Sequence, residues 1–159
     1  MKNLSIILVI LFCGATFSQS ENFETGYIEI LKKDIQTEAK KLVGENLEMT
    51  AEQAEIFWPL YDEYDAELLE LSNERLNVIS SYMLDYYDLS NEKAESLVKQ
   101  AMDIEQKRLD LKKKYITKMN EVLPQKLVGK FFQIDNYLQT LITIQRQSTI
   151  PFINTENEE

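Results

Sequence analysis

The sequence predicts an all-α fold, an elongated four-helix bundle whose second and third helices form a long antiparallel hairpin, an arrangement that can be cradle-shaped. Apolar residues recur at spacings of three, four and seven over long stretches, which is the period of one face of an α-helix. The 159-residue chain contains only 4 glycines and 3 prolines, so it offers few irregular loops. No stretch combines alternating β-branched residues with turn signals, as a sheet would require.

The N-terminal 18 residues have the features of a secretory signal peptide. Lys2 gives a short positive start, and an apolar run follows up to Cys13. Small residues precede Gln19 and suit cleavage there, and the run is too short to span a bilayer stably. We therefore expect an exported, periplasmic protein with no stable membrane insertion after cleavage; the alternative is an uncleaved anchor. The predicted organisation is a signal peptide over 1–18, a single helical domain over 19–152 and a disordered acidic tail over 153–159.

The first mature helix is predicted over about 26–43, with Gly44 as its stop. The second is predicted over about 51–86. Its start is marked by Thr50, which is followed three residues later by a glutamine, the spacing of a capping box. Trp58, close to that start, is expected to be buried. A helix of this length needs a partner along most of its surface.

The turn of the hairpin is predicted where the apolar pattern breaks, at residues 87–90. Ser90 is expected to cap a third helix that runs to about residue 122. Pro124 suits the first turn of a fourth helix, because a proline there loses no helical hydrogen bond. Pro151 is expected to end that helix.

The composition excludes most kinds of catalytic site. Cleavage removes the only cysteine, and the chain has no histidine, so disulfides, thiol nucleophiles, imidazole bases and His or Cys metal ligands are excluded. Closely spaced carboxylates, such as Asp62 with Asp65 or Glu63 with Glu67, leave acid–base chemistry or Ca²⁺ binding as an alternative. Because no glycine-rich loop or organised ligand sequence accompanies them, we expect no enzymatic activity, catalytic residue, cofactor or metal.

The charge is strongly negative and unevenly placed. The net charge of −10 argues against binding to nucleic acid or anionic lipid. Residues 45–88 contain twelve acidic side chains and one basic one, whereas residues 106–130 contain eight basic and two acidic ones. One interpretation is two solvated helix faces that complement each other when packed antiparallel. The other is a basic surface for acidic partners at Lys112, Lys113 and Lys114.

Two short segments resemble the paired LTxxQ motifs of the Spy/CpxP family. They are Met49-Thr50-Ala51-Glu52-Gln53 and its weaker echo Leu89-Ser90-Asn91-Glu92-Lys93. The plain alternative is that both segments are simply helix caps. A further likeness is to uncharacterised exported members of this family with a Phe-Trp-Pro segment, here Phe57-Trp58-Pro59. The resemblance covers roughly residues 28–141. It implies a periplasmic, all-helical and often dimeric protein that acts as a chaperone, as an inhibitor of an envelope-stress sensor or as a metal-responsive protein.

The expected function is that of an exported, non-enzymatic, chaperone-like or envelope-stress-related binding protein for unfolded proteins. The alternative is a regulatory or sensory partner of an envelope signalling protein. Amphipathic side chains at the far end of the hairpin are the expected client surface, unless they pack as core: Tyr82, Met83, Tyr86 and Tyr87. We also expect a homodimer, because so long a hairpin exposes an apolar face that short flanking helices cover only in part.

Overall fold

The computed structural model describes residues 37–155 and is all-α, with four helices and no strand in that part of the chain. The predicted fold class is therefore confirmed. The signal peptide (1–18), the first part of the first helix (26–36) and the end of the acidic tail (156–159) lie outside the described residues. The chain divides into two units, Met1–Gly44 and Glu45–Glu159, which are described separately.

The first helix is described from residue 37 and continues to residue 46. Gly44 therefore does not end it, and the predicted end at residue 43 was wrong by three residues. A glycine inside a helix costs about 1 kcal/mol relative to alanine but does not interrupt the hydrogen-bonded ladder.

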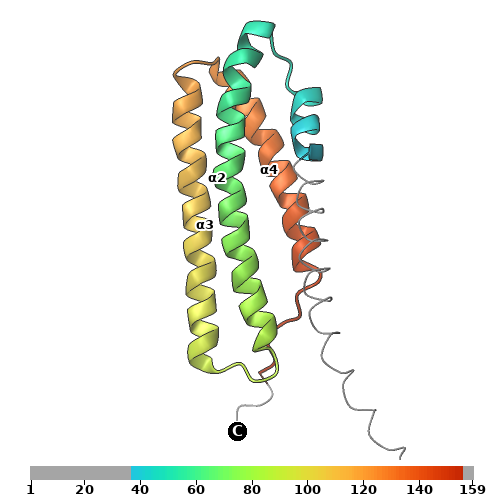
Figure 1. Cartoon of the computed structure of the whole chain (residues 1–159), viewed down its shortest axis with the longest axis vertical. Helices are drawn as coiled ribbons and strands as arrows, with labels where there is room; N and C mark the ends of the chain where they lie inside the picture. The colour runs from blue at the N-terminus through green and yellow to red at the C-terminus, as the bar shows by residue number, and fades with distance from the viewer. Residues whose placement is uncertain (1–36, 156–159) are drawn as a thin grey trace, which may run out of the picture. The chain divides into compact units, whose positions relative to one another are not determined.

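Three long helices make up the unit Glu45–Glu159. They are α2 (Ala51–Leu84), α3 (Asn91–Asn120) and α4 (Gln125–Gln147). In Figure 1, α2 and α3 lie side by side and run in opposite directions, and α4 crosses behind α2 at an angle. The helix α2 continues through Pro59 without a break. None of the helices in residues 37–155 combines the length and apolarity needed to cross a membrane.

The helix starts are those predicted from the sequence. Thr50 Oγ1 accepts from the backbone N–H of Gln53 at 3.2 Å, and Gln53 Oε1 accepts from the backbone N–H of Thr50 at 3.0 Å, which completes the capping box. Ser90 Oγ accepts from the backbone N–H of Lys93 at 3.2 Å. Both segments that resemble LTxxQ motifs therefore act as helix caps. Leu89 also packs against the core, next to the Ser90 cap.

Two groups of apolar side chains hold the three helices together. At the end near the start of α2, large aromatic rings from all three helices meet edge to face, a favourable geometry for aromatic pairs. At the other end the buried residues are aliphatic, with Tyr82 and Leu89 packed against them: Val78, Leu97 and Ile104. Trp58 is half-buried, not buried as predicted, whereas the adjacent Phe57 is 1% exposed.

Ion pairs between α2 and α3 fix the register of the hairpin. Glu63 pairs with Lys118, Glu67 with Lys114 at 2.6 Å and Glu74 with Lys107 at 2.8 Å. Each step of four or seven residues forward along α2 is matched by an equal step backward along α3, as antiparallel helices require. The acidic side chains of α2 therefore pair with basic side chains of α3 inside the hairpin. This agrees with the interpretation that the two charged faces complement each other when the helices pack antiparallel.

We expect the capping box to stabilise the protein measurably. Thr50→Ala removes the hydroxyl acceptor and should lower the free energy of unfolding by about 1 kcal/mol. Thr117→Ala is the matched control, because Thr117 is exposed inside α3 and its hydroxyl bonds only a carbonyl of its own helix. Urea unfolding followed by circular dichroism measures both. Equal losses in the two variants would contradict the role of the cap.

Candidate functional site

A buried carboxylate lies where the three helices meet. Asp135, on α4, is 5% exposed and is the buried charged residue of the described core. Its Oδ2 accepts a hydrogen bond from the Tyr64 hydroxyl of α2 at 3.1 Å and pairs with the Lys112 ammonium of α3 at 3.0 Å. The Lys112 ammonium also donates to Asn136 Oδ1. One carboxylate thereby joins all three helices.

Aromatic rings enclose this polar group. The Tyr64 ring packs edge to face with Tyr115, Phe131 and Phe132, with centroids 5.4–5.9 Å apart. Burial, followed by the charge of Asp135 and the hydrogen bond to it, raises the pKa of the Tyr64 hydroxyl. The hydroxyl therefore stays protonated and remains a donor at any physiological pH. Among the described residues, no buried side-chain nitrogen or oxygen lacks a hydrogen-bond partner.

Sequence reasoning missed Asp135, although the sequence contained a signal. Asp135 occupies an apolar face of α4, four residues after Phe131 and three before Leu138. A carboxylate in such a stripe is rarely buried without a cationic or hydrogen-bonding partner. The sequence could not identify that partner, because Tyr64 is 71 residues away and Lys112 is one of three consecutive lysines.

The three predicted partner-binding lysines do not form one basic patch. Lys112 bonds the buried Asp135, Lys113 pairs with Asp110 in its own helix at 3.2 Å, and Lys114 pairs with Glu67. Glu67 also accepts from the Tyr115 hydroxyl at 2.7 Å. The hydrogen bonds from Lys114 and Tyr115 lower the pKa of the Glu67 carboxyl. Each of these lysines therefore has an internal acidic partner, and their role as a docking surface stays a prediction.

The predicted client residues lie together at the α2–α3 turn, with different exposures. Tyr82 and Tyr86 are half-buried, and the Tyr82 hydroxyl donates to the carbonyl oxygen of Pro151 at 3.0 Å. That bond brings the segment after α4 to the end of α2. Met83 is exposed, and Tyr87 is 92% exposed.

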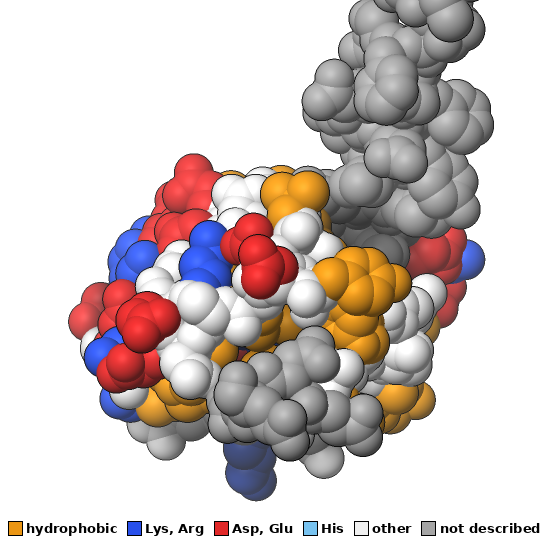
Figure 2. Space-filling model, turned by 90° about the horizontal axis from the view of Figure 1, so that it is seen from below, with side chains coloured by type: hydrophobic (Ala, Val, Ile, Leu, Met, Phe, Trp, Pro, Cys, Tyr) orange, Lys and Arg blue, Asp and Glu red, His pale blue; other side chains and the backbone are white. Residues whose placement is uncertain are grey.

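Further apolar side chains enlarge this surface. Leu84 at the end of α2 and Phe152 after α4 are almost fully exposed, at 87% and 95%. Figure 2 views this end of the molecule and shows hydrophobic side chains at the surface among charged ones. We call the exposed part of this surface the apolar tip: Met83, Leu84, Tyr87 and Phe152.

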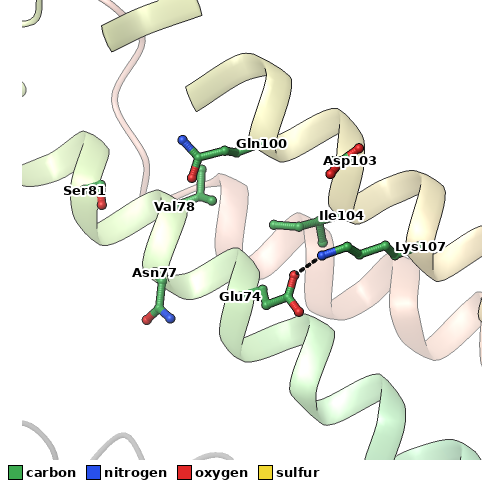
Figure 3. A pocket seen from close by; sticks show the side chains of 8 residues that line it. All are labelled: Glu74, Asn77, Val78, Ser81, Gln100, Asp103, Ile104 and Lys107. Atoms are coloured by element: carbon green, nitrogen blue, oxygen red, sulfur yellow. Dashed lines mark hydrogen bonds and ion pairs between the residues drawn. The ribbon is translucent and has the colours of Figure 1, made fainter. Parts of the chain in front are cut away.

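A shallow hollow between α2 and α3 contains no reactive arrangement of side chains. It encloses about 330 Å³ and has Val78 and Ile104 among its lining residues. Lys107 reaches across from α3 to Glu74 of α2 (Figure 3). That ion pair raises the pKa of the Lys107 ammonium, which therefore stays charged.

The closely spaced carboxylates of α2 do not converge on a metal site. Glu63 and Glu67 bond lysines of α3. In residues 37–155, no group of three or more His, Cys, Asp or Glu side chains is arranged to hold a metal ion.

The buried carboxylate should contribute far more to stability than a surface one. Asp135→Ala leaves the Lys112 ammonium, whose side chain is 20% exposed, without its buried partner and the Tyr64 hydroxyl without an acceptor. We expect the free energy of unfolding to fall by about 3 kcal/mol. Asp110→Ala breaks the exposed pair with Lys113 and should cost less than about 1 kcal/mol. Urea denaturation compares the two, and similar losses would contradict a structural role of Asp135.

Comparison of the chain with protein-family models, with curated proteins and with solved structures finds no match.

Proposed function

We propose that this chain is an exported, non-enzymatic binding protein, similar to the Spy/CpxP family, that holds unfolded polypeptides reversibly. The observation that carries the proposal is the apolar tip. Large apolar side chains are expensive to leave in water, and several of them exposed at one end of the molecule support a surface for interaction. The motif segments at Thr50 and Ser90 and the signal-like N-terminus support the family and the location.

The chemistry of the apolar tip suits weak and unspecific contacts. Methionine adapts its shape to irregular partners, and tyrosine offers an apolar ring with a polar end. Acidic residues lie next to these groups, with Asp85 and Asp88 in the turn itself. Such charges keep an apolar surface soluble and limit self-association. A surface of this kind favours transient capture over a tight, permanent interface.

The alternative is a regulatory partner of an envelope signalling protein. The two functions differ in the number and state of the proteins bound. A pull-down from envelope extract distinguishes them, because one stoichiometric folded partner supports regulation, whereas many unfolded proteins support the chaperone function.

The client surface can be tested with the double variant Met83→Ser/Tyr87→Ser. We expect it to lose most of the ability to suppress aggregation of a chemically denatured client, measured by light scattering at near-stoichiometric ratio. Its own stability should change little, because substitutions at such exposed positions usually stay within about 0.5 kcal/mol per site.

The matched control for this experiment is Tyr137→Ser, which alters an exposed tyrosine (65%) in the middle of α4, away from the apolar tip. Tyr137→Ser should protect the client as well as the wild type does. Equal activity of the double variant and the control would refute the assignment of the surface. Absence of protection by the wild type at large excess would refute the chaperone function itself.

We further propose that the protein is a homodimer whose interface includes the N-terminal part of α3, where Val98 is 54% exposed. A second copy would cover apolar side chains that the hairpin leaves in water. Light scattering of the mature protein should give the mass of two chains, and Val98→Glu should shift it towards one. A wild-type mass of one chain at low and high salt would exclude the dimer.

A further inference from the structure

The arginines of this acidic chain are gathered in one place. The sequence contains only three, and each of the long helices carries one: Arg75 on α2, Arg108 on α3 and Arg146 on α4. Arg75 and Arg108 line a groove of about 680 Å³ between α3 and α4, together with Lys112. Arg146 lies close enough that the charges of Arg108 and Arg75, after its partial burial, lower the pKa of its guanidinium.

Within residues 37–155, none of these three guanidinium groups forms an ion pair with a carboxylate. Every ion pair formed between residues in the described part of the chain uses a lysine. Arg108 donates instead to the neutral side chain of Gln139 at 2.7 Å. Glu105 also lines the groove, but it forms no ion pair with the arginines. In a chain with 27 acidic residues, three half-buried arginines that repel one another, with Glu105 as a nearby counter-charge but no ion pair, form an unusual arrangement.

We propose that this groove binds a small ligand that carries two or more oxyanion groups, either carboxylates or phosphates. The planar guanidinium matches both groups through paired N–H donors, and several such donors converge here. Side-chain amides and hydroxyls of α4, including Gln139 and Thr140, add neutral hydrogen-bonding groups along the same wall. Met102, Leu109 and Ile144 give the groove an apolar part for the uncharged body of the ligand.

The size of the groove agrees with this class of ligand, because pockets for small molecules usually enclose about 300–1,000 Å³. Binding would add to the counter-charge that Glu105 provides. It would connect α2, α3 and α4 along a groove that begins at Lys112 and Asn136, beside the aromatic cluster, and extends to Gln147. This site is independent of the apolar tip, so its test does not depend on client binding.

The experiment measures the unfolding temperature of the full mature protein in increasing concentrations of citrate or pyrophosphate, with sodium chloride at matched ionic strength as reference. Polyvalent anions also stabilise proteins generally by exclusion from the surface, but that effect does not saturate at low concentration. We expect a saturable rise with at least one of the two anions. Saturation with citrate alone assigns a carboxylate ligand, and saturation with pyrophosphate alone assigns a phosphate ligand.

Arg108→Gln should weaken the apparent affinity at least tenfold. Lys126→Gln is the matched control, because it makes the same charge change on α4, ten residues before the nearest groove residue on that helix, or roughly 15 Å along its axis. If Arg108→Gln proves unstable without ligand, Arg75→Gln replaces it with the same expected loss. No saturable rise in the wild type, or equal binding by the arginine variants and Lys126→Gln, would overturn the proposal.

Discussion

The three-helix core depends on one buried interaction, the contact of Asp135 with Tyr64 and Lys112. Edge-to-face rings would tolerate a small slide of α4 along the hairpin, because apolar contact has little directional preference. Bonds of about 3 Å to a single carboxylate oxygen do not tolerate it. Removing a charge from water is costly, because its hydrogen bonds to water are lost. Only the native packing of the three helices replaces them with hydrogen bonds inside the protein. We therefore regard this group as the determinant of how α4 is seated on α2 and α3.

The ion pairs of the hairpin explain the apparent contradiction between a very acidic α2 and a basic α3. Each helix alone would carry strong like-charge repulsion along its length. When the two helices pack together, opposite charges attract at matched positions, and this attraction sets the register of the hairpin. Exposed pairs of this kind add little energy individually. Their combined effect is to disfavour a parallel or shifted arrangement. Because the lysines of the ladder are bonded in this way, the groove between α3 and α4 draws its unpaired positive charge from Arg75 and Arg108.

Local signals made most of the fold predictable, and long-range pairings made the site unpredictable. The caps at Thr50 and Ser90 and the apolar stripes depend on residues three to seven apart, so they can be read from the sequence. The partner of Asp135 and the convergence of Arg75, Arg108 and Arg146 depend on which faces of three helices meet, and no periodicity encodes that choice. The different partners of the three adjacent lysines could not be read from the sequence for the same reason, since neighbours on a helix point in different directions and Lys112 points inward.

The matched steps of the α2–α3 ladder restrict how the length of this hairpin can change during evolution. Loss of one residue within α2 would rotate everything beyond it by 100° and shift it by 1.5 Å, which would turn the paired side chains away from the seam. Loss of seven residues rotates the helix by only about 20° from its former phase. Relatives with longer or shorter hairpins should therefore differ by whole heptads, gained or lost together in both helices, whereas the turn at residues 85–90 can vary freely.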